Sequence, residues 1–181
     1  MKKITAVFLC ALMLMCGAAW AADGPAGLKP LEAEDFSVSD GKNTIVLDSP
    51  FTDFEIDLPE EETSYVGEEY TGDFVYKVYQ HTYADFNLYT SNRYYNLKDR
   101  NFDYYYIVQI TLKTPNFKTN RGISVGAHVD DLLKAYGPGE ESNDDGVICL
   151  LYTLGDMRLQ FDMRNQRVQG ITAFVYANED N

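Results

Sequence analysis

Arg121-Gly-Ile-Ser-Val-Gly-Ala-His-Val-Asp-Asp-Leu-Leu-Lys-Ala-Tyr-Gly137 is the stretch of sequence that decides the expected fold. After its second glycine, apolar side chains recur at helical spacing: Val129, Leu132, Leu133 and Tyr136. This spacing predicts one short amphipathic helix. Gly137 suits the left-handed conformation that ends helices, and Pro138 cannot continue the helix. We expect this helix to brace a sheet and shield its apolar face. An open cleft lined by Val129, Leu133 and Tyr136 beside ionisable groups, or the absence of a sheet beneath the helix, would overturn the prediction of a non-catalytic protein.

Three runs with strand character follow the predicted helix. Residues 147–154 are strongly apolar, residues 157–163 alternate with period two, and residues 168–176 form the last run. An acidic loop is predicted over 139–146. Alternation also predicts strands before the helix, over 44–48, 73–82, 85–90 and 104–113.

Two details of the first half bear on its surface. In the run 104–113, the pattern places Tyr106 and Val108 on the face of Ile110, with Tyr105 on the opposite face. Residues 49–58 fit a helix and a strand equally well, and this alternative stays open.

Together these elements predict an α+β fold, in which one or two short helices pack on one face of an antiparallel sheet. A tandem repeat of one helix and three strands is a further hypothesis, because Val108-Gln-Ile-Thr111 is similar to Val168-Gln-Gly-Ile-Thr172. The first helix of such a repeat would lie within 49–66. The expected organisation is a signal peptide (1–21), a flexible leader (22–42), a β-rich half (43–117), and a helix-plus-three-strand half (118–178) packed with it as one domain.

The first residues predict export. Lys2 and Lys3 precede an apolar run, 4–15, that has the length of a signal-peptide core and is too short to span a bilayer. Ala19-Trp20-Ala21 offers small residues for cleavage after Ala21. Cys16 raises a lipoprotein as the alternative, but Met15 is bulkier than the residue that usually precedes a lipidated cysteine. We expect a periplasmic or extracellular protein without a transmembrane segment after cleavage.

Composition restricts the function. The net charge of −13 becomes −15 without Lys2 and Lys3, which argues against nucleic-acid binding. Nine acids and no base lie between Asp53 and Asp73; a solvated acidic loop is the simplest interpretation, and a dipolar surface that steers a partner is the alternative.

Tyrosine marks the expected contact surface. Eleven of the fourteen tyrosines lie between Tyr65 and Tyr106. Tyrosine suits half-buried strand faces and also binding surfaces. The predicted contact residues are Tyr79, Tyr89, Arg93, Tyr94, Tyr95, Lys98 and Arg100.

Catalytic and metal chemistry is weakly represented. Cys149 with His81 or His128 could form a nucleophile and base, but Cys149 lies in a very apolar run where a thiol is unreactive. Two distant histidines and one cysteine do not suit zinc. Asn143-Asp-Asp-Gly146 could bind calcium weakly, although a surface turn explains it as well. The sequence therefore predicts no enzyme, no metal and no cofactor.

Four short motifs resemble a known family: Thr119-Asn-Arg-Gly-Ile-Ser-Val-Gly126, Ala135-Tyr-Gly137, Leu159-Gln-Phe161 and Val168-Gln-Gly-Ile171. They are similar to exported bacterial proteins of the β-lactamase-inhibitor-protein-like class, and the outer-membrane assembly lipoprotein BamE has a related helix-then-three-strand pattern. The resemblance covers about 118–176. It implies helices packed on an antiparallel sheet, and exported binding or scaffold roles without catalytic residues.

One departure from the family concerns the helix start. Ala127 and His128 stand where similar motifs carry an acid and a serine or threonine, so a poorer N-cap is expected, with Asp130 compensating. The function we expect is an exported, non-catalytic domain that binds a macromolecular partner in the envelope or outside the cell. The alternative is a small-molecule or glycan-binding protein that uses exposed tyrosines.

Overall fold

The computed structural model describes residues 28–71, 74–93, 101–144 and 146–176. Within these residues the strands are β1 (Ser37–Ser39), β2 (Thr44–Val46), β3 (Glu62–Thr71), β4 (Phe74–Thr82), β5 (Phe86–Ser91), β6 (Tyr106–Leu112), β7 (Lys118–Thr119), β8 (Glu140–Asp144), β9 (Val147–Leu154), β10 (Met157–Arg164) and β11 (Arg167–Val175). The α-helix is α1 (Val129–Tyr136), and two short 3₁₀ turns span Ala33–Phe36 and Phe51–Asp53. The signal peptide predicted over 1–21 lies outside the described residues.

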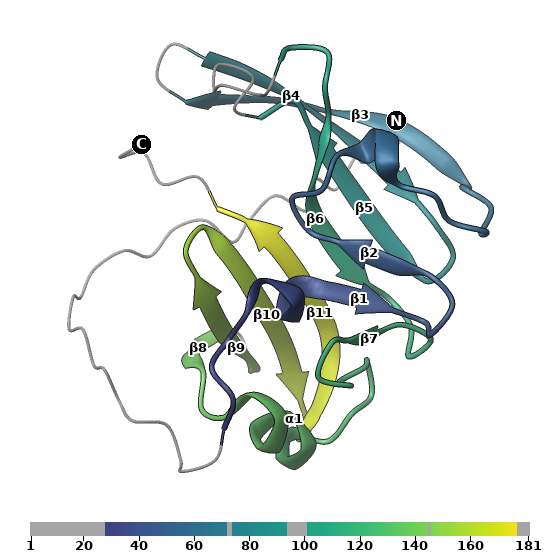
Figure 1. Ribbon diagram of the computed structural model, residues 1–181. Helices are drawn as coiled ribbons and strands as arrows, with labels where there is room; N and C mark the ends of the chain where they lie inside the picture. The colour runs from purple at the N-terminus through teal and green to yellow at the C-terminus, as the bar shows by residue number, and fades with distance from the viewer. Residues whose placement is uncertain (1–27, 72–73, 94–100, 145, 177–181) are drawn as a thin grey trace, which may run out of the picture.

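Two antiparallel sheets build the fold (Figure 1). Eight strands form the large sheet in the order β3-β4-β5-β6-β11-β10-β9-β8, and β2-β1-β7 form a small sheet. The predicted α+β class is wrong, because α1 is the only α-helix in the part of the chain that the structure describes, and the small sheet contributes to the same core. The physical reason lies in β1 and β2, whose buried Val38 and Ile45 follow strand alternation, so strands and not a second helix pack there.

The large sheet consists of two four-stranded meanders joined side by side. The first meander is β3–β6 and the second is β8–β11, and their last strands pair with each other. Thr111 and Thr172, which hold the same place in the two similar sequence runs, are direct partners across this junction. The predicted unit of one helix and three strands is nevertheless wrong. Each meander has four strands, and in the described residues within 49–66, where the first helix was expected, the helical structure is the 3₁₀ turn Phe51–Asp53.

One face of the large sheet carries the core. Phe86, Leu88, Ile110, Phe161 and Ile171 are almost fully buried there, against side chains of the small sheet and α1. The other face carries half-buried polar side chains, which include Asn87, Thr111, Gln160 and Thr172. We call these the inner and outer faces. Burying each large apolar side chain on the inner face contributes about 1.5–3 kcal/mol before chain entropy is counted.

The two edge strands of the large sheet were not expected. β8 lies within the predicted acidic loop 139–146, and β3 lies within the acidic stretch 53–73. Both strands carry carboxylates and few apolar residues, so their alternation is hidden in the sequence. Acidic side chains on an edge strand also oppose pairing with a second sheet. The acidic residues that hide these two strands in the sequence therefore suit their position at the edges of the sheet.

The flexible leader predicted over 22–42 gives way to regular structure earlier than expected. Ala33–Phe36 forms a 3₁₀ turn, β1 follows directly, and Phe36 is fully buried. Asp35 forms an ion pair with Arg121 at 2.6 Å between Oδ2 and Nη2. Arg121 also donates to the carbonyls of Lys29 and Pro30. These bonds join segments about 86–92 residues apart in sequence, which local composition does not show.

The ion pair at Asp35 has an electrostatic signature. Burial acts to raise the pKa of the Asp35 carboxyl, but hydrogen bonds from Arg121 and from the backbone N–H of Glu32, with the positive charge of Arg121, bring the pKa below its ordinary value. Arg121 also lies over the ring of Tyr136, 5.0 Å from the ring centroid. The first residue of the sequence stretch that decides the fold therefore links the N-terminal segment to α1.

The predicted helix is confirmed from Val129 to Tyr136. His128 replaces the expected serine or threonine as N-cap, because its Nδ1 accepts a hydrogen bond of 3.2 Å from the backbone N–H of Asp130. Gly137 ends the helix with a φ of 77°, a value that favours glycine. Leu132 is 0% exposed, whereas Leu133 is 39% exposed. Only part of the predicted apolar stripe is therefore buried.

Candidate functional site

The first meander carries a pocket lined by aromatic rings and hydroxyl groups, which we call the tyrosine pocket. Its volume is about 460 Å³, within the range of small-molecule sites. The lining residues come from the 3₁₀ turn before β3, from β3, β4 and β5, and from the segment that leads into β6. They are Phe51, Thr52, Thr63, Tyr79, His81, Thr90, Asp103 and Tyr105.

A β-bulge in β6 brings Tyr105 to this pocket. Val108 is an extra residue between the pairs that join β6 to β5. A bulge reverses the alternation of side chains before it, so Tyr105 lies on the inner face with its ring centroid 5.5 Å from that of Tyr79. The prediction that placed Tyr106 and Val108 on the face of Ile110, with Tyr105 opposite, is wrong for this reason.

A second bulge, in β3, shapes the other side of the pocket. The register between β3 and β4 shifts between Tyr65 and Gly67, which leaves Val66 as the extra residue. Gly67 has a φ of 150°, a conformation that side chains disfavour. Tyr65 pairs with Tyr79, and their ring centroids lie 5.3 Å apart. Since Tyr65 is 52% exposed, it extends the aromatic surface beyond the pocket.

The segment before β3 supplies one wall. The backbone N–H of Phe51 donates to the carbonyl of Tyr105 at 2.8 Å, and the N–H of Ile107 donates to the carbonyl of Ser49 at 3.0 Å. These bonds fix the 3₁₀ turn beside β6. The ring of Phe51 consequently lies against the ring of His81, with 4.4 Å between centroids.

His81 is held in the floor of the pocket by two hydrogen bonds. Its Nδ1 lies 3.1 Å from Oε1 of Glu60, and its Nε2 lies 3.1 Å from Oγ1 of Thr90. A ring that carries its proton on Nδ1 donates to the carboxylate and accepts from the hydroxyl, so this tautomer satisfies both nitrogens. The order hydroxyl–imidazole–carboxylate is that of an acyl-transfer triad. Thr90, however, is a secondary alcohol that is only 1% exposed.

The electrostatic environment of the pocket is negative. Burial raises the pKa of Tyr105, and the neighbouring Tyr79, Asp103 and Tyr65 raise it further. For Tyr65, burial and then the charge of Glu68 raise the pKa. Each charged neighbour in these two cases disfavours a further negative charge. The carboxylates of Asp103 and Glu68 also favour a positive charge on a group bound nearby, whereas burial opposes a charge of either sign.

The structure places the predicted contact residues that it describes in different environments, not on one surface. Tyr79 lines the tyrosine pocket. Tyr89 lies on the outer face, where it pairs with Gln80 and Gln109. Tyr94, Tyr95, Lys98 and Arg100 lie outside the described residues.

Arg93 does not belong to an open contact surface. It is 5% exposed, donates from Nη1 to the carbonyl of Val175 at 2.8 Å, and forms an ion pair with Glu69. It thus connects β3 to the end of β11. Arginine in a basic stretch suggested a surface role, but a buried guanidinium with these acceptors stabilises the junction of the meanders.

The sequence did not single out most lining residues of the pocket. Phe51 lies in the stretch 49–58 whose structure was ambiguous, and the bulges that orient Tyr65 and Tyr105 have no simple sequence signal. His81 was considered only with Cys149. The tyrosine excess did indicate the region that contains the tyrosine pocket, so a local count of aromatic residues was the useful signal for the pocket.

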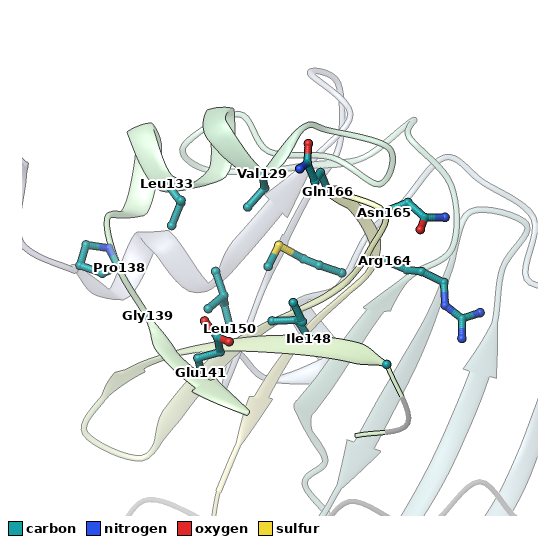
Figure 2. Close-up of a pocket in the computed structure, with 12 residues that line it drawn as sticks. Val129, Leu133, Pro138, Gly139, Glu141, Ile148, Leu150, Arg164, Asn165 and Gln166 are labelled. Carbon is teal, nitrogen blue, oxygen red and sulfur yellow. The ribbon is translucent and has the colours of Figure 1, made fainter. Parts of the chain in front are cut away.

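A second pocket, the helix groove, lies between α1 and the second meander. Its volume is about 470 Å³. Figure 2 shows Val129 and Leu133 of α1 facing Ile148 and Leu150 of β9 across it. The other lining residues are Pro138, Gly139, Glu141, Gly146, Met163, Arg164, Asn165 and Gln166. The side chain of Arg164 points away from the cavity in Figure 2, so the walls are mainly apolar.

This groove limits the expected role of α1 as a brace. Val129 and Leu133 line an open groove that also includes the ionisable Glu141 and Arg164, whereas Tyr136 is buried against Tyr152 and Phe161. One side of the helix therefore shields the sheet, and the other side borders open space.

Other candidate chemistry is not assembled in the described part of the chain. Cys149 and His81 lie on opposite faces of the large sheet, because Cys149 pairs with Asp162 on the outer face. The Sγ atom of Cys149 lies 3.2 Å from Oδ1 of Asp162. Among the described residues, no three His, Cys, Asp or Glu side chains are close enough to hold a metal ion.

Comparison of the chain with protein-family models, with curated proteins and with solved structures found no match. The resemblance to β-lactamase-inhibitor-protein-like and BamE-like proteins therefore remains a prediction. No helix within the described residues has the length and apolar character needed to cross a membrane.

Proposed function

We propose that the chain is an exported, non-catalytic domain that binds a macromolecular partner in the cell envelope or outside the cell, with the tyrosine pocket at the centre of the contact. The observation that carries the proposal is that Tyr79 and Tyr105 line one pocket of the sheet and that Tyr65 continues the aromatic surface beside it. Aromatic side chains that are held in place and still exposed are typical anchors of protein interfaces.

Export rests on the start of the sequence. The two lysines, the apolar run 4–15 and the small residues before position 22 are the features that a signal peptidase requires. Cys149 is the only cysteine after position 16, so a chain that begins at residue 22 forms no internal disulfide. Its stability then depends on the core of the two sheets.

The non-catalytic assignment rests on the hydrogen-bonded series Thr90–His81–Glu60. Both ring nitrogens of His81 have partners inside the protein, and Thr90 is almost fully buried. These bonds orient the ring against Phe51 and keep the pocket in shape. A test is the His81→Gln variant, which should keep partner binding within about threefold while lowering the melting temperature, because it removes buried hydrogen bonds.

Small-molecule or glycan binding is the second candidate. The pocket volume of about 460 Å³ and the exposed rings favour it, since sugar rings stack on tyrosine faces. A glycan array with a thermal-shift screen separates the two functions. A small ligand that binds the folded state raises the melting temperature, and the stabilisation grows with the logarithm of one plus the ligand concentration divided by Kd.

The direct experiment compares two substitutions in the same sheet. Tyr79→Leu removes a pocket ring, and Tyr89→Leu removes a ring of the same kind from the outer face. In quantitative affinity capture from envelope fractions, we expect Tyr79→Leu to lose a set of proteins that the parent and Tyr89→Leu both retain. Equal capture by all three proteins would exclude the tyrosine pocket as the contact surface.

A further inference from the structure

We infer that the tyrosine pocket binds a positively charged side chain, with arginine preferred over lysine, supplied by a basic segment of the partner. The inference rests on the proposed function and specifies the chemistry of the same site. It depends on three properties of the pocket: the arrangement of its rings, its charge and its hydrogen-bonding groups.

The rings form walls that suit a cation. The planes of Tyr79 and Tyr105 meet at 74°, with centroids 5.5 Å apart. Tyr65 adds a third ring at 58° to Tyr79, beside the pocket and outside its lining, and Phe51 lines the pocket with its ring against that of His81 on β4. The pocket is open to solvent, so rings at steep angles to each other can form a partial aromatic cage, the kind of site that binds ammonium and guanidinium groups.

The charge of the pocket matches the same guest. Asp103 lines the pocket, and Glu60 accepts from His81 at its floor. The next residues of the chain, Glu61 and Glu62, lead into the acidic edge strand β3. An approaching basic segment therefore meets a row of carboxylates before it reaches the rings, which increases the rate of association.

Within the described residues, one base near this surface is already engaged. The ammonium of Lys77, two residues before Tyr79 on β4, lies 5.3 Å from the ring centroid of Phe102. Neither residue lines the pocket. The neighbourhood thus contains one cation–ring contact within the protein, and the pocket rings stay accessible for a second from outside.

The hydroxyl groups favour arginine. Thr52 and Thr63 lie at the pocket together with the carboxylate of Asp103, so acceptor oxygens surround the aromatic walls. Guanidinium has five donors in one plane and stacks on rings, whereas an ammonium is a compact charge that is more strongly hydrated. A planar group can lie on one ring and donate from its edge to these oxygens at the same time.

The test uses the full exported chain and three synthetic peptides of one length. The first carries three arginines spaced by glycine and serine, the second carries lysines, and the third carries citrullines, which have the shape of arginine without its charge. Dissociation constants are measured by titration at low and at physiological salt. We expect the arginine peptide to bind at least tenfold more tightly than the citrulline peptide, with the lysine peptide between them.

Matched variants separate the pocket from the general negative charge of the chain. Tyr79→Leu and Tyr89→Leu leave the net charge unchanged, so attraction to the whole protein predicts the same affinity for both. We expect about a tenfold loss with Tyr79→Leu, a loss of about threefold to fivefold with Asp103→Asn, and no change with Tyr89→Leu. Tyr79→Phe keeps the ring and should keep the affinity, which also guards against a folding defect in Tyr79→Leu.

The outcomes distinguish this inference from the proposed function. If the citrulline and arginine peptides bind equally and both are lost in Tyr79→Leu, the pocket is a contact site but the preference for a cation is wrong. If the arginine peptide binds Tyr79→Leu as tightly as the parent, or binds the parent no better than the citrulline peptide at any salt concentration, the inference is overturned. Loss of envelope partners in Tyr79→Leu would still support the proposed function in that case.

Discussion

The two meanders of the large sheet have the same strand order but differ in what fills equivalent positions. When the central pair Thr111 and Thr172 is matched, the strand registers make Tyr79 the counterpart of Ile148 and His81 the counterpart of Leu150. Tyr79 and His81 line the tyrosine pocket, and their counterparts Ile148 and Leu150 line the helix groove. The same two positions of the sheet therefore carry polar side chains with aromatic rings in the first meander and aliphatic side chains in the second.

The covering elements differ in the same way. α1 lies over the second meander, and the shorter 3₁₀ turn Phe51–Asp53 lies beside the first. A short turn leaves Tyr65 and Tyr105 accessible, whereas α1 buries Leu132 and Tyr136. Together with the proposed function, this difference leads us to propose that the cover of the second meander serves mainly stability and that the open side of the first meander serves binding. The predictions below test this division, from the largest expected effect on stability to the smallest.

Phe161 in the second meander should be among the most sensitive core positions. Its side chain is 0% exposed and packs against Tyr136 and Tyr152. Phe161→Ala should lower the free energy of unfolding by about 3–5 kcal/mol, because it leaves a cavity under α1. Denaturant titration measures the loss. The neighbouring Gln160→Ala, on the outer face, serves as control, and an equal loss in both variants would contradict the assignment of the faces.

Two adjacent leucines test the helix itself. Leu132→Ala should cost about 2–5 kcal/mol, because this side chain is fully buried. Leu133→Ala should cost less than about 1.5 kcal/mol, since Leu133 is partly exposed at the helix groove. Both losses are measured by thermal or denaturant unfolding. If Leu133→Ala were the more damaging change, the helix would be rotated relative to the sheet.

The ion pair between Asp35 and Arg121 should give a pH-dependent effect. The folded-state pKa of Asp35 lies below its ordinary value, so the carboxylate stabilises the fold above the unfolded pKa of about 4. That contribution is lost as the pH falls through the folded-state pKa. Asp35→Asn should cost about 1.5–3 kcal/mol at pH 7.

Unfolding measured between pH 2 and pH 7 tests this prediction. The difference between the parent and Asp35→Asn should shrink below about pH 4. The control is Asp57→Asn, at the exposed pair with Lys42, where exposed ion pairs contribute little. A difference for Asp35→Asn that did not change with pH would mean that its charge is not the stabilising property.

Exchanging residues between the meanders should have the smallest effect on stability. Tyr79→Ile gives the tyrosine pocket the residue of its counterpart, and the free energy of unfolding should change by less than about 1.5 kcal/mol because Tyr79 is only half-buried. Binding of the arginine peptide should nevertheless fall about tenfold. Tyr89→Ile is the matched control on the outer face. A large loss of stability without a change in binding would reverse the division between the meanders.

The sequence predicted the second meander better than the first for a physical reason. In 129–176 the helix spacing and the alternation of apolar residues agree with local turns, so α1 and β9–β11 were expected at nearly their observed positions. β3 and β8 were missed because edge strands here carry charge in place of alternating apolar residues. The 3₁₀ turn Ala33–Phe36 was missed because Asp35 and Phe36 are fixed by distant partners.

The candidate site was only partly predictable. The tyrosine excess pointed to the part of the chain that forms the tyrosine pocket, and to Tyr79 in its lining. The bulges at Val66 and Val108 decide which neighbouring tyrosines join it, and a bulge depends on pairing between strands that local pattern does not reveal. Arg93 was assigned to the surface because its acceptors, the carbonyl of Val175 and the carboxylate of Glu69, lie on other strands.

The most direct test of the account is a nuclear Overhauser experiment on the chain with the arginine peptide, in which only the tyrosine rings of the protein carry protons. We predict contacts from the arginine side-chain methylene protons to the rings of Tyr79 and Tyr105, and none to Tyr89. Contacts to Tyr89, or to Tyr136 and Tyr152 near α1 without any to Tyr79, would contradict the assignment of binding to the first meander.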